Sequence, residues 1–343
     1  MTSKTRAAIA ASITALLALG ASACSSASGG DSADSEQLSF VGFSVLETAN
    51  EPVFQGFEGT SEGKDVTFKT SYGASGDQSR AVEGGLDADV VHFSLEPDMQ
   101  RLVDAGIVAD DWKDTPTNGI ATSSVVTLVV REGNPKDIQG WDDLVEPGVE
   151  IITPNPASSG SAKWNILAAW AHVTGNGGSE QEAEAFVKQM LENTIALPSS
   201  GREATTAFSE GNGDVLLSYE NEAILARANG EPFDYIVPDD TLLIENPAAV
   251  TVDAPESATA FRDYQITPEA QAAYALSGFR PVIDGVDLPE VEGANDPADP
   301  FPTPAKLFTI DDDFNGWAEA NTKFFDENDG IITQLQAETG TSE

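Results

Sequence analysis

The chain has 343 residues, which is enough for about two domains, and it carries 57 Asp and Glu against 17 Lys and Arg, a formal net charge of −40 at pH 7. A charge this negative excludes nucleic acid and an anionic membrane surface as electrostatic partners. A disordered acidic chain is excluded as well, because 16 Phe, 5 Trp, 5 Tyr and a clear apolar periodicity can build a core.

The N-terminal segment has the pattern of a bacterial secretion signal. Residues 1–23 contain two positive charges, an apolar run too short to span a bilayer, and then small residues. The only cysteine, Cys24, follows directly and resembles the cysteine of a lipobox, although Ala21 stands where Leu is usual. The pattern predicts a lipoprotein signal peptide over 1–23, lipid on Cys24, a flexible tether over 24–37 and an extracytoplasmic location, either anchored to the outer face of the cell membrane or periplasmic. An unlipidated signal peptide with a chance cysteine is the alternative.

After the tether, predicted strands alternate with predicted helices. The strands are residues 38–44, 65–71, 89–93, 123–130, 149–153, 214–219 and 242–252, the last one interrupted by Pro247. The helices are residues 45–57, 75–86, 97–105, 161–175, 179–192, 220–229, 256–264 and 268–276, followed by a loop over 285–304 and a helical tail over 313–340. The alternation predicts an α/β protein with βαβ units and mostly parallel sheets flanked by helices.

Four short Ser/Gly segments come between a strand and a helix, at residues 44–47, 75–78, 158–162 and 200–203. Three of them fit the S-x-x-E/Q capping box, in which Ser44, Ser75 and Ser200 are the capping residues. Helix capping alone explains any one of them. However, ligands of open α/β sheets bind beyond the carboxyl ends of the strands, where these segments lie. Unpaired N–H groups at several helix N-termini could hold an anion without any Lys or Arg.

The same segments carry a family resemblance from about Leu38 to the tail. The chain resembles the sulfate-binding proteins of bacterial sulfate/thiosulfate ABC importers in the runs SYGASGDQSRAV (71–82), GLDADVV (85–91), GNPKDIQGWDDLVEPGVEIITPNPASSGSAKWNILAAWA (133–171), GREATTAF (201–208), GDVLLSYENEA (213–223) and LFTIDDDFNGWAEA (307–320). The resemblance implies a two-lobed periplasmic binding protein of the second type, which binds dehydrated sulfate between its lobes through hydrogen bonds alone.

The resemblance also implies the anion-binding residues, position by position. It places side-chain and backbone donors at Ser75, Ser159, Gly160 and Ser161, where Ser161 replaces a glycine of the family pattern. Further backbone donors fall on Ser44, where some members have Asp, and on Gly201. Tyr219 stands where some members have a Trp, and a Tyr hydroxyl can accept as well as donate a hydrogen bond.

The implied organisation has lobe 1 at residues 38–123 plus 248–306, lobe 2 at 124–247 and a C-terminal helical tail at 307–343. Independently of the resemblance, the strands 123–130 and 248–252 each stand between βα blocks, which suggests that they are crossovers linking two lobes. The implied function is capture of sulfate, or thiosulfate, by a monomeric lipoprotein that delivers it to the transmembrane subunits of an ABC permease. The expectation includes no catalysis, no cofactor, no metal, no nucleic acid, and membrane attachment only through the N-terminal lipid.

Two alternatives stay open. One is another tetrahedral oxyanion, molybdate or tungstate. The other is an extracytoplasmic hydrolase built on His92 and His172 or on the pair Glu220 and Glu222; we expect the histidines to be structural and the glutamates to brace a helix start. Asp311, Asp312 and Asp313 lack the spacing of a Ca²⁺ loop and predict a solvated helix start, and Asp77 is expected to point to solvent.

Overall fold

The computed structural model describes residues 35–341, so the predicted signal peptide, Cys24 and most of the tether lie outside the described residues. The strands are β1 (Glu36–Phe43), β2 (Val66–Gly73), β3 (Val90–His92), β4 (Ile120–Arg131), β5 (Ile151–Ile152), β6 (Thr194–Ala196), β7 (Val215–Tyr219), β8 (Phe233–Ile236), β9 (Asp240–Val250) and β10 (Lys306–Phe308). The helices are α1 (Leu46–Glu58), α2 (Ser75–Glu83), α3 (Glu96–Asp104), the 3₁₀ helix η1 (Trp141–Val145), α4 (Gly160–Gly175), α5 (Glu180–Glu192), α6 (Gly201–Ser209), α7 (Glu220–Ala228), α8 (Glu256–Gln265), α9 (Pro268–Leu276), α10 (Ile310–Phe314), α11 (Trp317–Phe325) and α12 (Ile331–Thr339).

The strands form a sheet in the order β2-β1-β3-β9-β4-β7-β5-β6, with β10 paired to β9 and β8 paired to β4. Two groups within it are parallel, β2-β1-β3 at one end and β7-β5-β6 at the other. The long strands β4 and β9 join these groups; they run antiparallel to each other, and β9 is antiparallel to β3 and β4 to β7. We call the β2-β1-β3 end, with its helices, the first half of the sheet, and the β7-β5-β6 end, with its helices, the second half.

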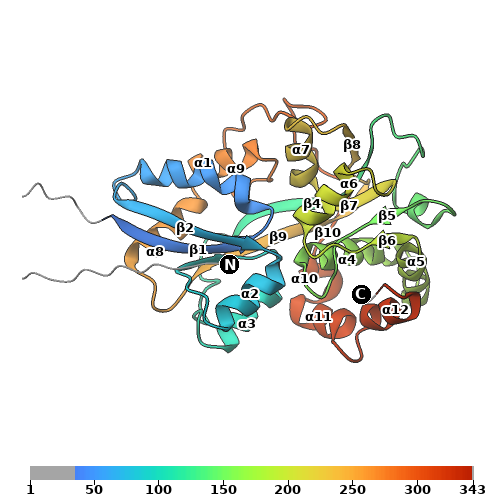
Figure 1. The fold of residues 1–343 in the computed structure, drawn as a ribbon, viewed down its shortest axis with the longest axis horizontal. Helices are drawn as coiled ribbons and strands as arrows, with labels where there is room; N and C mark the ends of the chain where they lie inside the picture. The colour runs from blue at the N-terminus through green and yellow to red at the C-terminus, as the bar shows by residue number, and fades with distance from the viewer. Residues whose placement is uncertain (1–34, 342–343) are drawn as a thin grey trace, which may run out of the picture. The chain divides into compact units, whose positions relative to one another are not determined.

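Helices cover both faces of each half, which confirms the predicted α/β fold class. Figure 1 shows α1 and α9 on one side of β1 and β2, with α2 and α3 on the other side. In the second half, α6 and α7 lie on one side and α4 and α5 on the other. This arrangement buries the β-branched and apolar residues of the strands; β4, for example, is buried over ten consecutive residues. Near-continuous apolar strands of this kind are typical of sheets that are covered on both faces.

Pro247 does not interrupt its strand, contrary to the sequence prediction. β9 runs through it from Asp240 to Val250. Pro247 lies where β9 exchanges its partner β4 for β3, next to an irregularity of the β4 register after Ile120. Its carbonyl still accepts a hydrogen bond from the Phe93 N–H. Because the ladder changes partners there, the missing N–H of proline is tolerated.

The predicted helical tail is broken into the three short helices α10, α11 and α12. Asn315 has φ of 57° and Gly316 has φ of 86°, so the chain is left-handed at two successive residues between α10 and α11. α11 then packs back on α4, where the rings of Trp164 and Trp317 meet edge to face with centroids 4.7 Å apart. The tail is therefore part of the packed structure of the second half.

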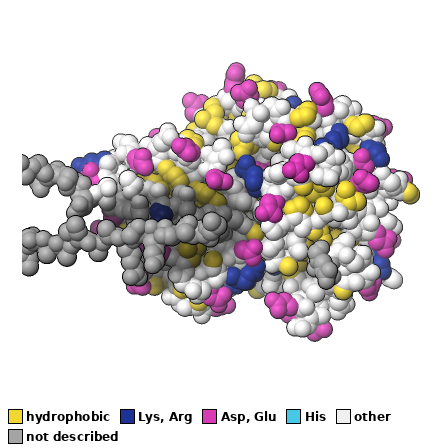
Figure 2. Space-filling view, viewed as in Figure 1, with side chains coloured by type: hydrophobic (Ala, Val, Ile, Leu, Met, Phe, Trp, Pro, Cys, Tyr) yellow, Lys and Arg dark blue, Asp and Glu magenta, His cyan; other side chains and the backbone are white. Residues whose placement is uncertain are grey.

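Carboxylates are spread over the surface. Figure 2 shows Asp and Glu side chains scattered across the visible face of the described residues, with far fewer Lys and Arg between them. On this face the negative charge is not gathered in one patch. Among the described residues, no helix has the length and apolar character needed to span a bilayer.

Candidate anion-binding site

A small pocket lies where the loop after β1 meets the N-termini of α2, α4 and α6. All the residues that line it are uncharged: Phe43, Ser44, Val45, Ala74, Ser75, Ser94, Ser159, Gly160, Ser161, Ser200 and Gly201. They follow strands from both halves of the sheet, as expected for a site beyond strand carboxyl ends. Six of the seven residues that the sequence predicts for anion binding line this pocket, and Tyr219 is the exception.

Three of the predicted backbone donors are available. Within the described residues, the N–H groups of Gly160 and Ser161 at the start of α4 and of Gly201 at the start of α6 have no backbone or side-chain acceptor. The first N–H groups of a helix have no partner inside the helix, and the helix dipole adds partial positive charge there. These N–H groups therefore place partial positive charge at the pocket, although none of the described residues that line it is cationic.

The hydroxyl of Ser159 is also available. Ser159 is 3% exposed, and its side chain makes no capping hydrogen bond to α4. Its own N–H donates to the carbonyl of Asn155 at 2.8 Å, which fixes the turn before the helix. A buried hydroxyl at the wall of the pocket is thus free to donate to a ligand.

Ser75 is in a different situation from Ser159. Its hydroxyl donates to Oδ2 of the buried Asp98 at 2.6 Å and accepts from the N–H of Ser94 at 2.9 Å. A hydroxyl has one proton, so Ser75 could donate to an anion only by releasing Asp98. The predicted role of its side chain stays a prediction, and in this structure the side chain joins α2 to the start of α3.

The backbone of Ser44 is also engaged. Its N–H donates to the carbonyl of Gly73 at 2.7 Å, an extension of the β1–β2 ladder. Ser44 lines the pocket, but its predicted backbone contact with an anion would require the loop after β1 to move. That contact likewise stays a prediction.

Tyr219 lies just behind the pocket wall. Its hydroxyl and that of Ser94 are 2.6 Å apart, and the Tyr219 side chain is 1% exposed. Burial raises the pKa of the Tyr219 phenol, so it stays protonated. Tyr219 therefore reaches the pocket through Ser94 in this structure.

Ser94 is a polar pocket residue that the sequence prediction missed. Besides its contacts to Ser75 and Tyr219, its carbonyl accepts from the indole Nε1 of Trp164 at 2.9 Å and from Nδ2 of Asn246 at 2.8 Å. It thereby connects both halves of the sheet. Ser94 could have been predicted from its position directly after the buried strand 89–93, because the other pocket serines also follow strand ends.

Two of the three predicted capping boxes are wrong. The helix after β1 is capped by Val45, and α2 is capped by Ala74, so neither Ser44 nor Ser75 is the capping residue. Ser200 does cap α6, accepting from the Glu203 N–H at 3.2 Å, while the Glu203 carboxylate turns to Ser199. The serines released from capping belong to the pocket wall.

Glu220 and Glu222 brace the start of α7, as predicted. Glu220 forms two hydrogen bonds with Arg280, at 2.6 and 3.0 Å, and Glu222 pairs with Arg202 at 2.9 Å. Burial raises the pKa of both carboxyls, and the arginines oppose this shift. Because each glutamate is bound to an arginine, neither is placed as a catalytic acid facing the pocket.

The remaining candidate residues are structural or exposed. His92 is fully buried between Thr122 and Gln265, and burial lowers its pKa to about 3. His172 lies 2.8 Å from Asp240 and 3.2 Å from Asp142, at the far end of α4.

The aspartates that the sequence analysis singled out are all exposed. Residues 311–313 are exposed in α10, and Asp77 is exposed and paired with Arg80. Among the described residues, no cluster of His, Cys, Asp or Glu could hold a metal ion.

Comparison with known proteins identifies the class. Residues 42–280 match the model of a family described as bacterial extracellular solute-binding proteins, and the chain belongs to this family. It is 40% identical to a sulfate-binding protein of Synechococcus elongatus over 91% of this chain and 90% of that protein. It is 33% identical to a thiosulfate-binding protein of Pseudomonas aeruginosa over 83% of this chain and 86% of that protein. Among solved structures, the sulfate-binding protein SubI of Mycobacterium tuberculosis H37Rv matches with a TM-score of 0.79 and 47% identity, covering 85% of this chain and all of that one.

Proposed function

We propose that the protein captures sulfate, or the related thiosulfate, outside the cytoplasm and delivers it to an ABC permease. The observation that carries this proposal is the set of unpaired donors around one uncharged pocket: the N–H groups of Gly160, Ser161 and Gly201 and the hydroxyl of Ser159. Helix N-termini of this kind bind anions through aligned N–H groups. The sulfate- and thiosulfate-binding relatives support the choice of ligand.

The pocket chemistry favours an anion that carries no proton. Sulfate is fully ionised at neutral pH and needs only donors, whereas phosphate still carries a proton that needs an acceptor. No carboxylate of the described residues lines the pocket, and the hydroxyl oxygens of Ser94 and Tyr219 already face each other. A donor left without a partner in a dry site costs about 1–3 kcal/mol. We therefore expect the protein to prefer sulfate to phosphate.

A thermal-shift panel tests the proposed function. An anion that binds only the native state raises the melting temperature. At anion concentrations above the Kd, this rise grows with the logarithm of the concentration. Sulfate or thiosulfate should give the largest shift in melting temperature. Molybdate, phosphate and chloride are tested separately for comparison. Equal shifts from sulfate and phosphate would contradict the pocket argument, and a larger shift from molybdate would reassign the ligand.

Two further parts of the proposal concern organisation and chemistry. We assign lobe 1 to residues 38–123 plus 248–306 and lobe 2 to residues 124–247. The exchange of partners along β4 and β9 supports the boundaries near residues 123 and 248, whereas residues 291–306 of the assigned lobe 1 contact the second half of the sheet. We also propose binding without turnover, since the histidines and glutamates considered above are engaged in structural contacts. Hydrolysis of an ester substrate by the purified protein would overturn this second part.

Attachment to the membrane through lipid on Cys24 completes the proposal. Cys24 lies outside the described residues, so the proposal depends on the sequence pattern alone. Stable anchoring takes two hydrophobic signals, as in a diacylated cysteine. The intact mass of the protein isolated from its native membrane gives the answer, and a mature chain without acyl mass on Cys24 would exclude the anchor.

A further inference from the structure

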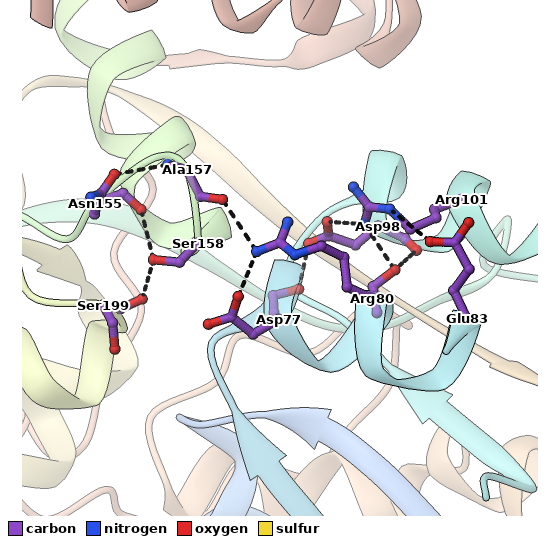
Figure 3. A network of polar contacts seen from close by, with 11 residues as sticks. Asp77, Arg80, Glu83, Asp98, Arg101, Asn155, Ala157, Ser158 and Ser199 are labelled. Carbon is purple, nitrogen blue, oxygen red and sulfur yellow. Dashed lines mark hydrogen bonds and ion pairs between the residues drawn. The ribbon is translucent and has the colours of Figure 1, made fainter. Parts of the chain in front are cut away.

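Helix α2 of the first half contacts a turn of the second half, residues 155–158, beside the pocket. The N–H of Gly76 donates to the carbonyl of Ser158 at 3.0 Å. One turn later, Nη2 of Arg80 donates to the carbonyl of Ala157 at 3.4 Å. Figure 3 shows Arg80 extended from α2 toward this turn. Two successive carbonyls of the turn are thus bound by one helix.

Both partners of this contact are held in place. Asp77 binds Nη2 of Arg80 at 2.5 Å on the same helix, which orients the guanidinium toward Ala157 (Figure 3). On the opposite side, the hydroxyl of Ser158 donates to the carbonyl of Ser199 at 2.7 Å. The exposed Asp77 therefore has a structural task that its sequence position did not predict.

The approach of the two segments depends on a glycine. A Cβ atom at Gly76 would lie 2.9 Å from the Ser158 oxygen and 3.3 Å from Nη1 of Arg80. A distance of 2.9 Å to a backbone oxygen is too short for a real Cβ, so a larger residue would push the turn away. The side chain of Arg80 thus closes over Gly76.

These contacts flank the pocket wall. Ser75 precedes Gly76 and Ser159 follows Ser158, and both serines line the pocket from opposite halves of the sheet. An anion that enters or leaves between α2 and α4 must separate Gly76 from Ser158 and Arg80 from Ala157. Closure of two bodies around a ligand is an established kind of motion, and contacts made only in the closed state set its population.

We propose that Arg80 is a positioning residue that holds the two walls of the anion pocket together and so determines how long a bound anion stays. The proposal rests on the proposed function. Arg80 is part of an exposed helix surface and lies outside the pocket lining, so it acts on the closed state without touching the anion. The contact between Arg80 and Ala157 forms after the anion has entered. Losing this contact should therefore change the dissociation rate of the anion.

The first experiment compares sulfate release from the unmodified protein and from Arg80→Ala by stopped-flow fluorescence. Loss of a hydrogen bond of this kind should speed release roughly two- to tenfold, with the association rate little changed. Arg80→Lys keeps the charge but loses the guanidinium, whose Nη2 binds both Asp77 and Ala157, so its release rate should lie between the two. Lys64→Ala is the matched control, since it removes one exposed positive charge from the same half of the sheet.

A second measurement works without any ligand. Spin labels at Glu58→Cys on α1 and Glu192→Cys on α5, both exposed, report the distance between the halves in a chain that carries Cys24→Ser. Arg80→Ala should shift this distribution to longer distances, and Lys64→Ala should not. If no oxyanion binds the unmodified protein, the proposed function fails while the distances still test the contact. Unchanged distances, or unchanged release in a protein that does bind, would overturn the role of Arg80.

Discussion

At the scale of single residues, the hydroxyl of Ser159 offers the most direct test of the pocket. Ser159→Ala should weaken sulfate binding about tenfold or more, because a hydrogen bond to a charged group contributes about 1.5–3 kcal/mol. The free energy of unfolding should stay within about 1 kcal/mol, since this side chain does not cap α4. Calorimetric titration and chemical denaturation measure the two quantities. Ser61→Ala, at an exposed serine, is the control, and an unchanged affinity in Ser159→Ala would remove this residue from the site.

Ser75→Ala should behave differently, because the Ser75 hydroxyl binds the buried carboxylate of Asp98. Removing one partner of a buried hydrogen bond costs about 1–3 kcal/mol, so the midpoint of denaturation should fall together with the affinity. The sequence alone predicts little effect on folding. Equal stability of Ser75→Ala and Ser159→Ala would show that Asp98 does not depend on Ser75.

Which serines lie near the pocket could be predicted, but what each one does could not. Ser75, Ser159 and Gly201 follow from the resemblance and from the strand-end rule. The hydroxyl of Ser75 binds Asp98, and Ser94 binds Tyr219 beside the pocket. Both contacts join residues that are far apart in the chain. A local sequence pattern contains no information on such partners.

At the scale of elements, His172 joins α4 to the start of β9 and to η1. Its ring lies between Asp240 and Asp142. Burial lowers the pKa of His172, but the hydrogen bonds and charges of the two aspartates outweigh it, so the net pKa is raised above the usual value of about 6.5. A histidine whose pKa is higher in the folded protein than in the unfolded chain stabilises the fold. This stabilisation is complete at a pH below the pKa of the unfolded chain, and it is lost as the pH rises through the pKa of the folded protein.

His172→Gln should therefore be destabilising at pH 6 and less so at pH 9. The measurement is the free energy of unfolding of both proteins across this range, taken as the difference between them. Taking the difference cancels the other titrating groups, including His92, whose lowered pKa destabilises the fold only as the pH falls below about 6.5. A difference that does not change with pH would mean that the two aspartates do not hold the proton.

Long, strongly patterned elements could be predicted, and short ones could not. The helices over 161–175 and 179–192 are found as α4 and α5 within one residue at each end. The three-residue strands β6 and β10 were missed, because so few residues show no period. Pro247 was misjudged for another reason: a proline is compatible with a strand where the hydrogen-bonding partner changes, and that point is set by the whole sheet.

At the scale of the whole molecule, the net charge of −40 opposes folding through self-repulsion. Raising the salt concentration from about 0.01 M to about 0.15 M shortens the screening length from about 30 Å to about 8 Å. The melting temperature should rise over this range, because exposed ion pairs, which salt weakens, contribute at most about 1 kcal/mol each. Choline chloride and sodium gluconate, beside sodium chloride, separate screening from binding of one ion. A flat or falling curve would show that repulsion does not limit stability.

The class of fold could be predicted from alternating strands and helices, but the path of β9 could not be derived from that alternation. β3 lies at Val90–His92 and pairs with residues 248–250. No local feature of either strand predicts this pairing. The sequence suggested the two crossovers only because an apolar strand stood between βα blocks at each place.

The pairing of β3 with the end of β9 has a consequence for the order in which the protein is made. A chain synthesised from its N-terminus holds β1, β2 and β3 long before residues 248–250 exist, so one edge of β3 stays open while the second half emerges. Unpaired strand edges promote aggregation, and pairings between distant residues form slowly. The first half of the sheet can therefore be completed only after the second half has been made, although its residues come first.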